Sequence, residues 1–358
     1  MGKRPASWKW SSSSVAVIPS AHVSFIVPRA TPVVPGTDTL PTRRLLGELT
    51  RTGPVPSAAR VRSVRSLGVS FQVYGPRPAR GWRIVEEIRK GRRGTWKDSN
   101  ERRWALYLAA LKSGGPRVLK SLLLLQRKAP AIRRRSAARA QALLPVPVRL
   151  ERAGVVFTPL DYDAMVDGNT VYFDPLLASM IGATGVARLL SHELHHIGRF
   201  LLTGENISGL DPRLASRQLT WTELIRFWAS LLEMEGIADM VFDVRDLSLP
   251  SYRRAMARRD RVASSYGPHL RRVERILLKR PGGPRAGPGA MGRAMQVVLK
   301  DAHPLGKRMA ETIRTEFGKQ SLVRSVGHPE RFFRAYQDAA VAARSFQFSE
   351  ELLASIPY

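Results

Sequence analysis

The sequence contains no cysteine among its 358 residues. Disulfide bonds, cysteine-ligated zinc and thiol catalysis are therefore excluded, and any bound metal must use His, Asp or Glu side chains. No run of about 18 uninterrupted apolar residues occurs either, so the sequence predicts no transmembrane helix. The absence of such a run predicts a soluble protein.

Acidic residues are scarce, since 29 Asp and Glu stand against 58 Lys and Arg and leave a net charge of +29. Such a balance attracts polyanions by long-range Coulomb forces and says little about the fold. A solvated basic surface is equally compatible with it. We therefore expect weak, non-specific polyanion binding at most. The hydrophobic fraction of 44% is ordinary for a globular enzyme.

Residues 1–80 form a basic, proline-rich region with only two acidic residues, Asp38 and Glu48. This composition predicts a flexible N-terminal region. Its start, MGKRPASWKW followed by VAVIPSAHVSFIVP, loosely imitates a signal peptide. Pro19, Ser20 and His22 interrupt the apolar part, so a cytoplasmic location is favoured over export.

Residues 81–145 form a basic helical region. The patterns WRIVEEIRK, NERRWALYLAALK and VLKSLLLLQRK predict three amphipathic helices, separated by the breakers GRRGT and SGGP. The arginines between 127 and 139 end this region, and a solvated helix face is favoured there over a phosphate-binding surface.

Residues 146–358 form the predicted catalytic domain. VRLERAGVVFTPL and NTVYFDP predict two short strands, joined by a polar turn that contains Asp167-Gly168. Asp174-Pro175 begins a short helix, and a longer helix, GVARLLSHELHHIGRFLL, follows it. WTELIRFWASLLEMEGIADMVF predicts a further helix. The predicted fold is thus α+β and mainly helical, with a small sheet before the helix that carries the key motif.

His192, Glu193 and His196 form an HExxH motif inside that longer helix. Residues at i and i+4 lie one above the other on a helix, so both imidazoles can reach one ion. Glu193 lies close enough to contact a water molecule held by the metal. The alternative is a set of ordinary helix-surface histidines, since a short motif also arises by chance.

A catalytic zinc ion takes three protein ligands and keeps one position for water, so a third ligand must exist. The metzincin extension is excluded because Arg199 and Leu202 stand where it requires Gly and His. A Glu from the following helix is the remaining solution, and its candidates are Glu223, Glu233 and Glu235.

Helical spacing separates these candidates, because Glu235 and Asp239 share one face with apolar residues while Glu233 points away from it. A bare carboxylate on such a face is costly, and metal coordination would offset that cost. Glu235 is therefore the predicted third ligand, and Asp239 would orient a ligand histidine. The alternative for both is an ion pair with an arginine. Gly236 indicates that this helix and the HExxH helix approach closely there.

The residues HELHH followed by EGIAD resemble the gluzincin group of zinc metallopeptidases. The segment DAHPLGKRMAETIRTEFGKQSLVRSVGHPERFFRAYQDAA is further similar to the tail of an uncharacterised family of zinc-dependent peptidases, with a G-x-x-M-A-x-x-I helix and a P-x-x-F-x-x-x-Y segment. The resemblance covers about residues 150–340. It implies a zincin-like fold, one Zn2+ bound by His192, His196 and Glu235, and Glu193 as general base.

One departure from that family concerns the oxyanion-stabilising side chain. The family tends to have an aromatic residue just before the Pro or Gly of the tail motif, and this chain has His303 there. We expect His303 to help stabilise the tetrahedral intermediate, with Tyr252 or Tyr266 as the alternatives.

The predicted function is zinc-dependent hydrolysis of peptide or protein substrates. By analogy, the strand Thr170–Asp174 would pair with an extended substrate. Two other readings stay open, namely a basic nucleic-acid-binding protein that uses the arginines at 127–139 and the Lys/Arg clusters at 253–280, and a catalytically inactive zincin-fold relative. Neither the oligomeric state nor the cleavage preference follows from the sequence.

Overall fold

In a computed structural model of the chain, the described residues are 37–38, 42–43, 45–47, 78–91, 96, 99–205, 220–242, 247, 253–279, 294–295, 297–298 and 301–356. Most of the predicted flexible region 1–80, with Pro19, Ser20 and His22, lies outside them. Tyr252 also lies outside them.

The chain divides into two compact units. The N-terminal unit holds the described residues between 26 and 142 and between 146 and 210, and the C-terminal unit holds 143–145 and those from 211 onwards. Both units are mainly helical and only the N-terminal unit holds a described sheet, which confirms the predicted α+β class. The three regions 1–80, 81–145 and 146–358 stay a prediction.

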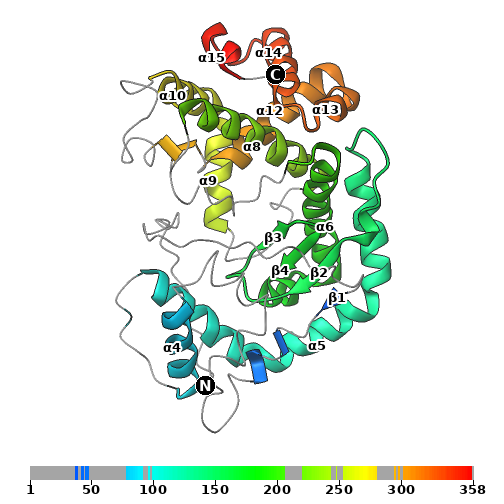
Figure 1. The fold of residues 1–358 in the computed structure, drawn as a ribbon, viewed down its shortest axis with the longest axis vertical. Coiled ribbons are helices and arrows are strands. Elements are labelled where there is room, and N and C mark those ends of the chain that lie inside the picture. Colours follow the sequence, from blue (N-terminus) through cyan, green and yellow to red (C-terminus); the bar gives the residue numbers. More distant parts are fainter. Residues whose placement is uncertain are drawn as a thin grey trace, which may run out of the picture. The chain divides into compact units, whose positions relative to one another are not determined.

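The N-terminal unit places a four-stranded sheet beside two long helices (Figure 1). The strand order is β1-β2-β4-β3, in which β2 runs parallel to β1 and β4 while β3 runs antiparallel to β4. The helix α6 follows β4 and packs against both α5 and the sheet. The elements are β1 (Thr37–Asp38), α4 (Pro78–Arg89), α5 (Ser99–Gln141), η1 (Leu150–Arg152), β2 (Gly154–Phe157), β3 (Ala164–Asp167), β4 (Thr170–Phe173) and α6 (Pro175–Thr203).

The sheet has two strands more than predicted, β1 and β3. The predicted turn at Asp167-Gly168 exists, with Gly168 at φ 56°, but it joins β3 to β4 in a hairpin. β3 was not predicted because its four residues lack a clear alternation of polar and apolar side chains. The strand Thr170–Asp174 was wrongly expected to pair with substrate, since β4 has β2 on one side and β3 on the other. Among the described strands, β3 keeps one edge without a strand partner.

α5 is one continuous helix of 43 residues, so the prediction that SGGP separates two helices is wrong. The helix passes through Pro116 and Pro130. A Cβ on Gly115 would lie 3.1 Å from a methyl carbon of Leu46, and one on Gly114 would lie 3.8 Å from Leu176 of α6. Tertiary packing of this small-residue surface overrides the local preference of Gly and Pro to end a helix.

α6 begins where the sequence predicted. Asp174 caps it, accepting a 2.8 Å hydrogen bond from the Leu177 N–H, and Pro175 occupies the first turn, where a missing N–H costs nothing. Gly182, at φ 64° and ψ −174°, kinks the helix and separates the short predicted helix from the longer one. Only glycine adopts this backbone conformation readily.

The C-terminal unit is helical in its described residues. Its central pair is α8 (Trp221–Val241) and α12 (Ala302–Phe317), which pack along much of their length. The remaining helices are α9 (Arg253–Ser264), α10 (Tyr266–Leu278), α13 (Lys319–Ser325), α14 (Pro329–Ala342) and α15 (Glu350–Ser355).

Two glycines set the distance between α8 and α12. A Cβ on Gly306 would lie 3.1 Å from the Cα of Gly236, and a Cβ on Gly236 would overlap the backbone of Gly306. A close approach at Gly236 is therefore present, but the helix nearest to it is α12, whereas the prediction placed the HExxH helix there. Within the described residues, no helix combines the length and apolar character that a bilayer crossing requires.

Candidate metal centre

The HExxH residues lie on α6, in its second, longer part. His192 and Glu193 are buried and His196 is half-buried. The Nε2 atoms of the two histidines lie 3.0 Å apart. Two nitrogens bound to one tetrahedral zinc ion at 2.0–2.1 Å would lie about 3.3 Å apart. The pair therefore presents two imidazole nitrogens at a separation that fits a shared ion.

A buried carboxylate anchors the start of this helix. Besides capping α6, Asp174 accepts hydrogen bonds from the Leu160 N–H at 2.8 Å and from the Tyr107 hydroxyl at 2.7 Å. Burial raises the pKa of Asp174 to about 6, and these hydrogen bonds oppose that rise. Burial beside Asp174 also raises the pKa of Tyr107. The helix start is thus tied to β2's end and to α5.

The turn before β3 holds a second buried carboxylate. Asp161 and Tyr162 both have positive φ, 53° and 68°, which non-glycine residues rarely adopt. Arg103 of α5 holds this turn through an ion pair of 2.7 Å with Asp161. Burial raises the pKa of Asp161 to about 7, although Arg103 opposes the rise. The sequence carried no local signal for this cluster, because its members are far apart in the chain.

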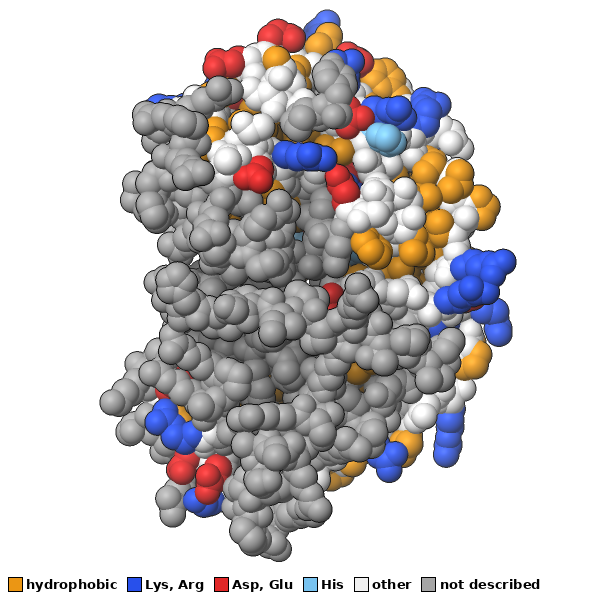
Figure 2. Space-filling model, in the orientation of Figure 1, with side chains coloured by type: hydrophobic (Ala, Val, Ile, Leu, Met, Phe, Trp, Pro, Cys, Tyr) orange, Lys and Arg blue, Asp and Glu red, His pale blue; other side chains and the backbone are white. Residues whose placement is uncertain are grey.

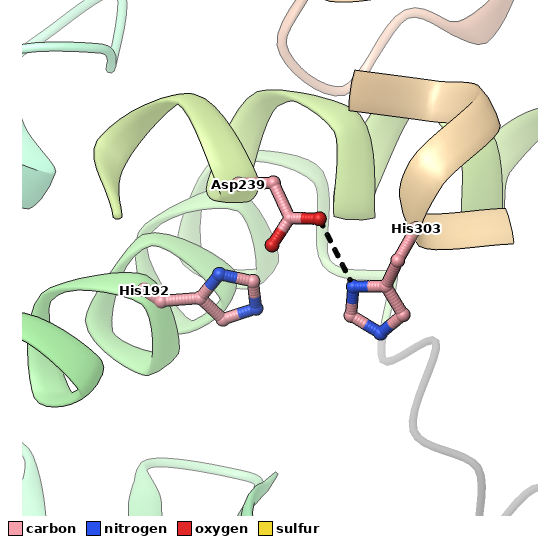
Figure 3. Close-up of side chains that lie close together, drawn as sticks. All are labelled: His192, Asp239 and His303. Carbon is pink, nitrogen blue, oxygen red and sulfur yellow. Dashed lines mark hydrogen bonds and ion pairs between the residues drawn. The ribbon is translucent and has the colours of Figure 1, made fainter. Parts of the chain in front are cut away.

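The C-terminal unit contributes a second set of candidate ligands, on α8 and α12. His303 lies near the start of α12, and its Nδ1 is 3.2 Å from Glu235 Oε2 and 3.3 Å from Asp239 Oδ2. Figure 3 shows this ring nitrogen turned to Asp239 and the other ring nitrogen pointing away from it. His192, also drawn there, comes from α6 of the N-terminal unit. The structure therefore brings Glu235, Asp239 and His303 together within one unit.

For Asp239, Arg259 is a candidate for the alternative, an ion pair with an arginine. Arg259 Nη1 lies 3.9 Å from Asp239 Oδ2, which is longer than a charge-assisted hydrogen bond. The contact with His303 is closer, and Asp239 is buried while Arg259 is partly exposed. A distant cation and a near imidazole are the expected surroundings of a carboxylate that orients a histidine.

The other two glutamates of α8 have structural roles. Glu233 is fully buried, and its carboxylate accepts a 3.0 Å hydrogen bond from the Gly327 N–H. Glu223 forms a capping box with Thr220, whose N–H donates to it at 2.7 Å. Glu223 lies 12 residues before Glu235, which is about 18 Å along a helix. Both roles separate these residues from the face that carries Glu235.

Of the alternatives to His303, Tyr266 is committed elsewhere. Tyr266 begins α10, and its hydroxyl bonds to the hydroxyl of Ser345, which follows α14. Its ring lies beneath the Arg308 guanidinium, whose central carbon is 5.3 Å from the ring centroid. Tyr252 lies outside the described residues.

The donor types in both units suit zinc. Imidazole nitrogen and carboxylate oxygen are common zinc ligands, and the separation of the two imidazoles on α6 fits one ion. His303 bound between two carboxylates resembles the hydrogen-bonded environment that holds ligand side chains in place.

The chain matches one known family. A family model described as putative zinc dependent peptidase matches residues 107–345, a range that contains α6, α8 and α12. The searches of curated proteins and of solved structures each found no match.

Proposed function

This chain belongs to the family described as putative zinc dependent peptidase, and we propose that it hydrolyses peptide bonds with one zinc ion bound by His192, His196 and Glu235. Peptides or proteins are then its substrates. Two histidines of one helix with a glutamate of a later helix form the gluzincin arrangement. This ligand set is the part of the proposal that goes beyond the family match.

The observation that carries the proposal is the 3.0 Å separation of the His192 and His196 Nε2 atoms. Histidines on a helix surface usually keep their rings apart in solvent, where each finds water. Here the rings converge edge to face, with centroids 4.7 Å apart, and His192 is buried. Convergence of a buried and a half-buried imidazole is costly unless an ion or a shared proton joins them.

Glu235 is the best third ligand for three reasons. Its side chain is 13% exposed, so it is largely shielded yet accessible. His303 and Asp239 lie beside it and can hold it in place. The family model covers both α6 and α8, so one match includes all three proposed ligands.

When bound, zinc would polarise the scissile carbonyl and lower the pKa of its water ligand towards 7. Glu193, next to a ligand in sequence, would accept the proton of that water and pass it to the leaving amine. Asp239 would orient a ligand or His303. Through its outward ring nitrogen, His303 would donate a hydrogen bond to the developing oxyanion.

β3 would position an extended substrate. It lies at an edge of the described sheet, in the same unit as α6. A peptide that adds to this edge would bind through main-chain hydrogen bonds, which do not depend on its side chains. Substrate recognition is then broad in sequence.

The test compares Glu193→Gln with His196→Ala. Glu193→Gln should retain about one zinc per chain, because three ligands remain, and should lose on the order of 10² to 10⁴-fold in peptide hydrolysis. His196→Ala should lose both zinc and activity. Zinc content is measured on protein purified without added zinc. Peptide hydrolysis is measured with a quenched-peptide assay.

His328→Ala is the matched control, because it also removes an imidazole but from a half-exposed position paired with Glu330. It should keep zinc and activity. Loss of zinc from Glu193→Gln would show that Glu193 is a ligand. A wild type that binds zinc but hydrolyses no peptide would favour the catalytically inactive relative.

A further inference from the structure

The outward face of α5 carries a continuous series of cations. Seven exposed Lys and Arg residues follow one another at intervals of one, three, four, six or seven residues, which keeps them close to one side of the helix. The series covers 22 residue steps, about 33 Å of helix. We call this surface the α5 basic face, and its cations are Arg117, Lys120, Arg127, Lys128, Arg134, Arg135 and Arg139.

Among the residues that the structure describes, no acidic group forms an ion pair with this face. The sequence has no Asp or Glu between Glu101 and Glu151. None of the seven cations forms an ion pair with another described residue.

Other cations of α5 are used within the fold. Arg103 pairs with Asp161, Lys112 donates to the Ile88 carbonyl at 3.0 Å, and Arg133 donates to the Glu151 carbonyl at 2.7 Å. Arg133 is therefore not available for phosphate binding. The α5 basic face consists of exposed cations that pair with no acidic group among the described residues.

Two leucines lie within this face. Leu123 and Leu124 are 50% and 49% exposed, and Leu124 lies one turn from both Lys120 and Lys128. Figure 2 shows Lys and Arg side chains with hydrophobic side chains near them along the right edge of the view, where Figure 1 draws α5. Exposed leucines among cations are unfavourable in water and favourable at a lipid headgroup boundary.

The chemistry of the face separates two polyanions. Single-stranded nucleic acids are bound by aromatic stacking as well as charge, and α5 has no aromatic residue after Tyr107. Phosphate contacts on a duplex gain little from leucine side chains. An anionic bilayer surface can bind both the cations and the leucines. Clusters of four to eight Lys and Arg on a helix bind acidic headgroups, and leucine side chains enter the interface.

We propose that the α5 basic face docks on the surface of an anionic lipid bilayer, lying along it without crossing it. This surface lies on a different helix from the zinc ligands, and its test does not depend on peptidase activity.

The experiment measures sedimentation of the full chain with phosphatidylcholine vesicles, with and without phosphatidylserine. Wild type should bind only the vesicles that contain phosphatidylserine, and salt should weaken binding. Each Lys or Arg near the surface contributes about fivefold in affinity. The triple variant Arg127→Gln, Arg134→Gln, Arg135→Gln should therefore bind about 100-fold more weakly.

The matched control removes three exposed cations from the C-terminal unit, in the variant Arg314→Gln, Lys319→Gln, Arg324→Gln. It should bind vesicles within a few fold of wild type. Equal losses in the two triple variants would show that net charge alone drives binding, and would overturn the proposal. Circular dichroism of each variant checks that the helices remain.

Leu123→Gln, Leu124→Gln keeps every charge, and it should weaken vesicle binding by about tenfold or more because two side chains no longer enter the interface. Unchanged binding would overturn the lipid assignment. Duplex DNA gives the last comparison. If the α5 triple variant loses DNA binding but keeps vesicle binding, the face is a nucleic-acid surface and the proposal is wrong.

Discussion

The two halves of the proposed zinc site are built in different ways. On α6, His192 and His196 are one turn apart, so a single helix suffices to bring their Nε2 atoms to 3.0 Å. In the C-terminal unit, His303 reaches Asp239 across 64 residues of sequence and from a second helix. That contact exists only because α8 and α12 meet at Gly236 and Gly306.

This difference determines how each half can fail. The α6 half depends on side chains and on a helix whose start is anchored by Asp174. The half on α8 and α12 depends on the packing of two backbones. Substitutions on α6 should therefore change metal binding or catalysis with little loss of stability, whereas those at the α8–α12 contact should change stability as well.

The largest expected effect distinguishes the two glutamates of α8. Glu235→Gln should lower zinc affinity more than 100-fold, because loss of a ligand exceeds the 10 to 100-fold typical of an orienting residue. Glu233→Gln should keep zinc but lower the melting temperature, because the buried Glu233 carboxylate accepts a hydrogen bond from the Gly327 N–H. Competition with a zinc chelator and thermal unfolding measure the two quantities.

The zinc affinity of Asp239→Asn should lie between those of Glu235→Gln and Glu233→Gln, about 10 to 100-fold below that of wild type. If Glu233→Gln loses zinc and Glu235→Gln keeps it, the ligand assignment is reversed.

His303→Phe should have the next largest effect. If His303 stabilises the oxyanion, its loss should lower kcat by about 10² to 10³-fold while zinc content stays near one per chain. Tyr266→Phe is the control, because that hydroxyl bonds to Ser345 instead. Unchanged turnover in His303→Phe would assign oxyanion stabilisation to another group.

Gly306→Ala tests the backbone contact itself. The added Cβ would overlap the Leu232 carbonyl, and backbone cannot yield as a side chain does. We expect the free energy of unfolding to fall by at least about 2 kcal/mol. Gly267→Ala in α10 is the matched control, since its Cβ would meet Phe346 at an ordinary 3.4 Å. Equal stability of the two variants in urea unfolding would contradict the close approach.

The smallest expected effect is a pH dependence in the N-terminal unit. The pKa of Asp161 is about 7 in the fold, above that of an unfolded chain, so the folded state holds its proton more tightly. Stability from this group is complete below about pH 4 and is lost as pH rises towards 7. Asp174, with a pKa of about 6, acts in the same direction.

Asp161→Asn cannot ionise, so its urea midpoint should fall less than that of wild type between pH 4 and pH 7, given the pKa of about 7. The urea midpoint of Arg103→Gln should fall more than that of wild type over the same pH range, because Arg103 is the cation that lowers the pKa of Asp161. Identical pH profiles in the three proteins would show that Asp161 does not titrate in this range.

Much of the N-terminal half-site could be predicted from local sequence. The helix start at Asp174-Pro175, the turn at Asp167-Gly168 and the helix carrying HExxH each depend on residues within a few positions of one another. The mainly helical α+β class was predicted on the same basis, and the structure confirms it. The family was predicted from a resemblance of HELHH, EGIAD and the C-terminal segment, and the family match confirms it.

Other predictions failed because long-range packing decided the outcome. Gly114, Gly115 and Pro116 predicted a helix break, yet contacts with Leu46 and Leu176 accompany an unbroken α5. β3 forms as the hairpin partner of β4, which a four-residue pattern could not reveal.

By itself, the sequence determined which residues share a helical face: His192 with His196, and Glu235 with Asp239. Helical periodicity alone produces these pairs. Only the tertiary structure decided that His303 lies against both carboxylates, that Glu233 binds the Gly327 N–H, and that Gly236 meets α12. Such contacts join residues that are far apart in the chain, and they form where backbones can pack, which local propensity does not encode.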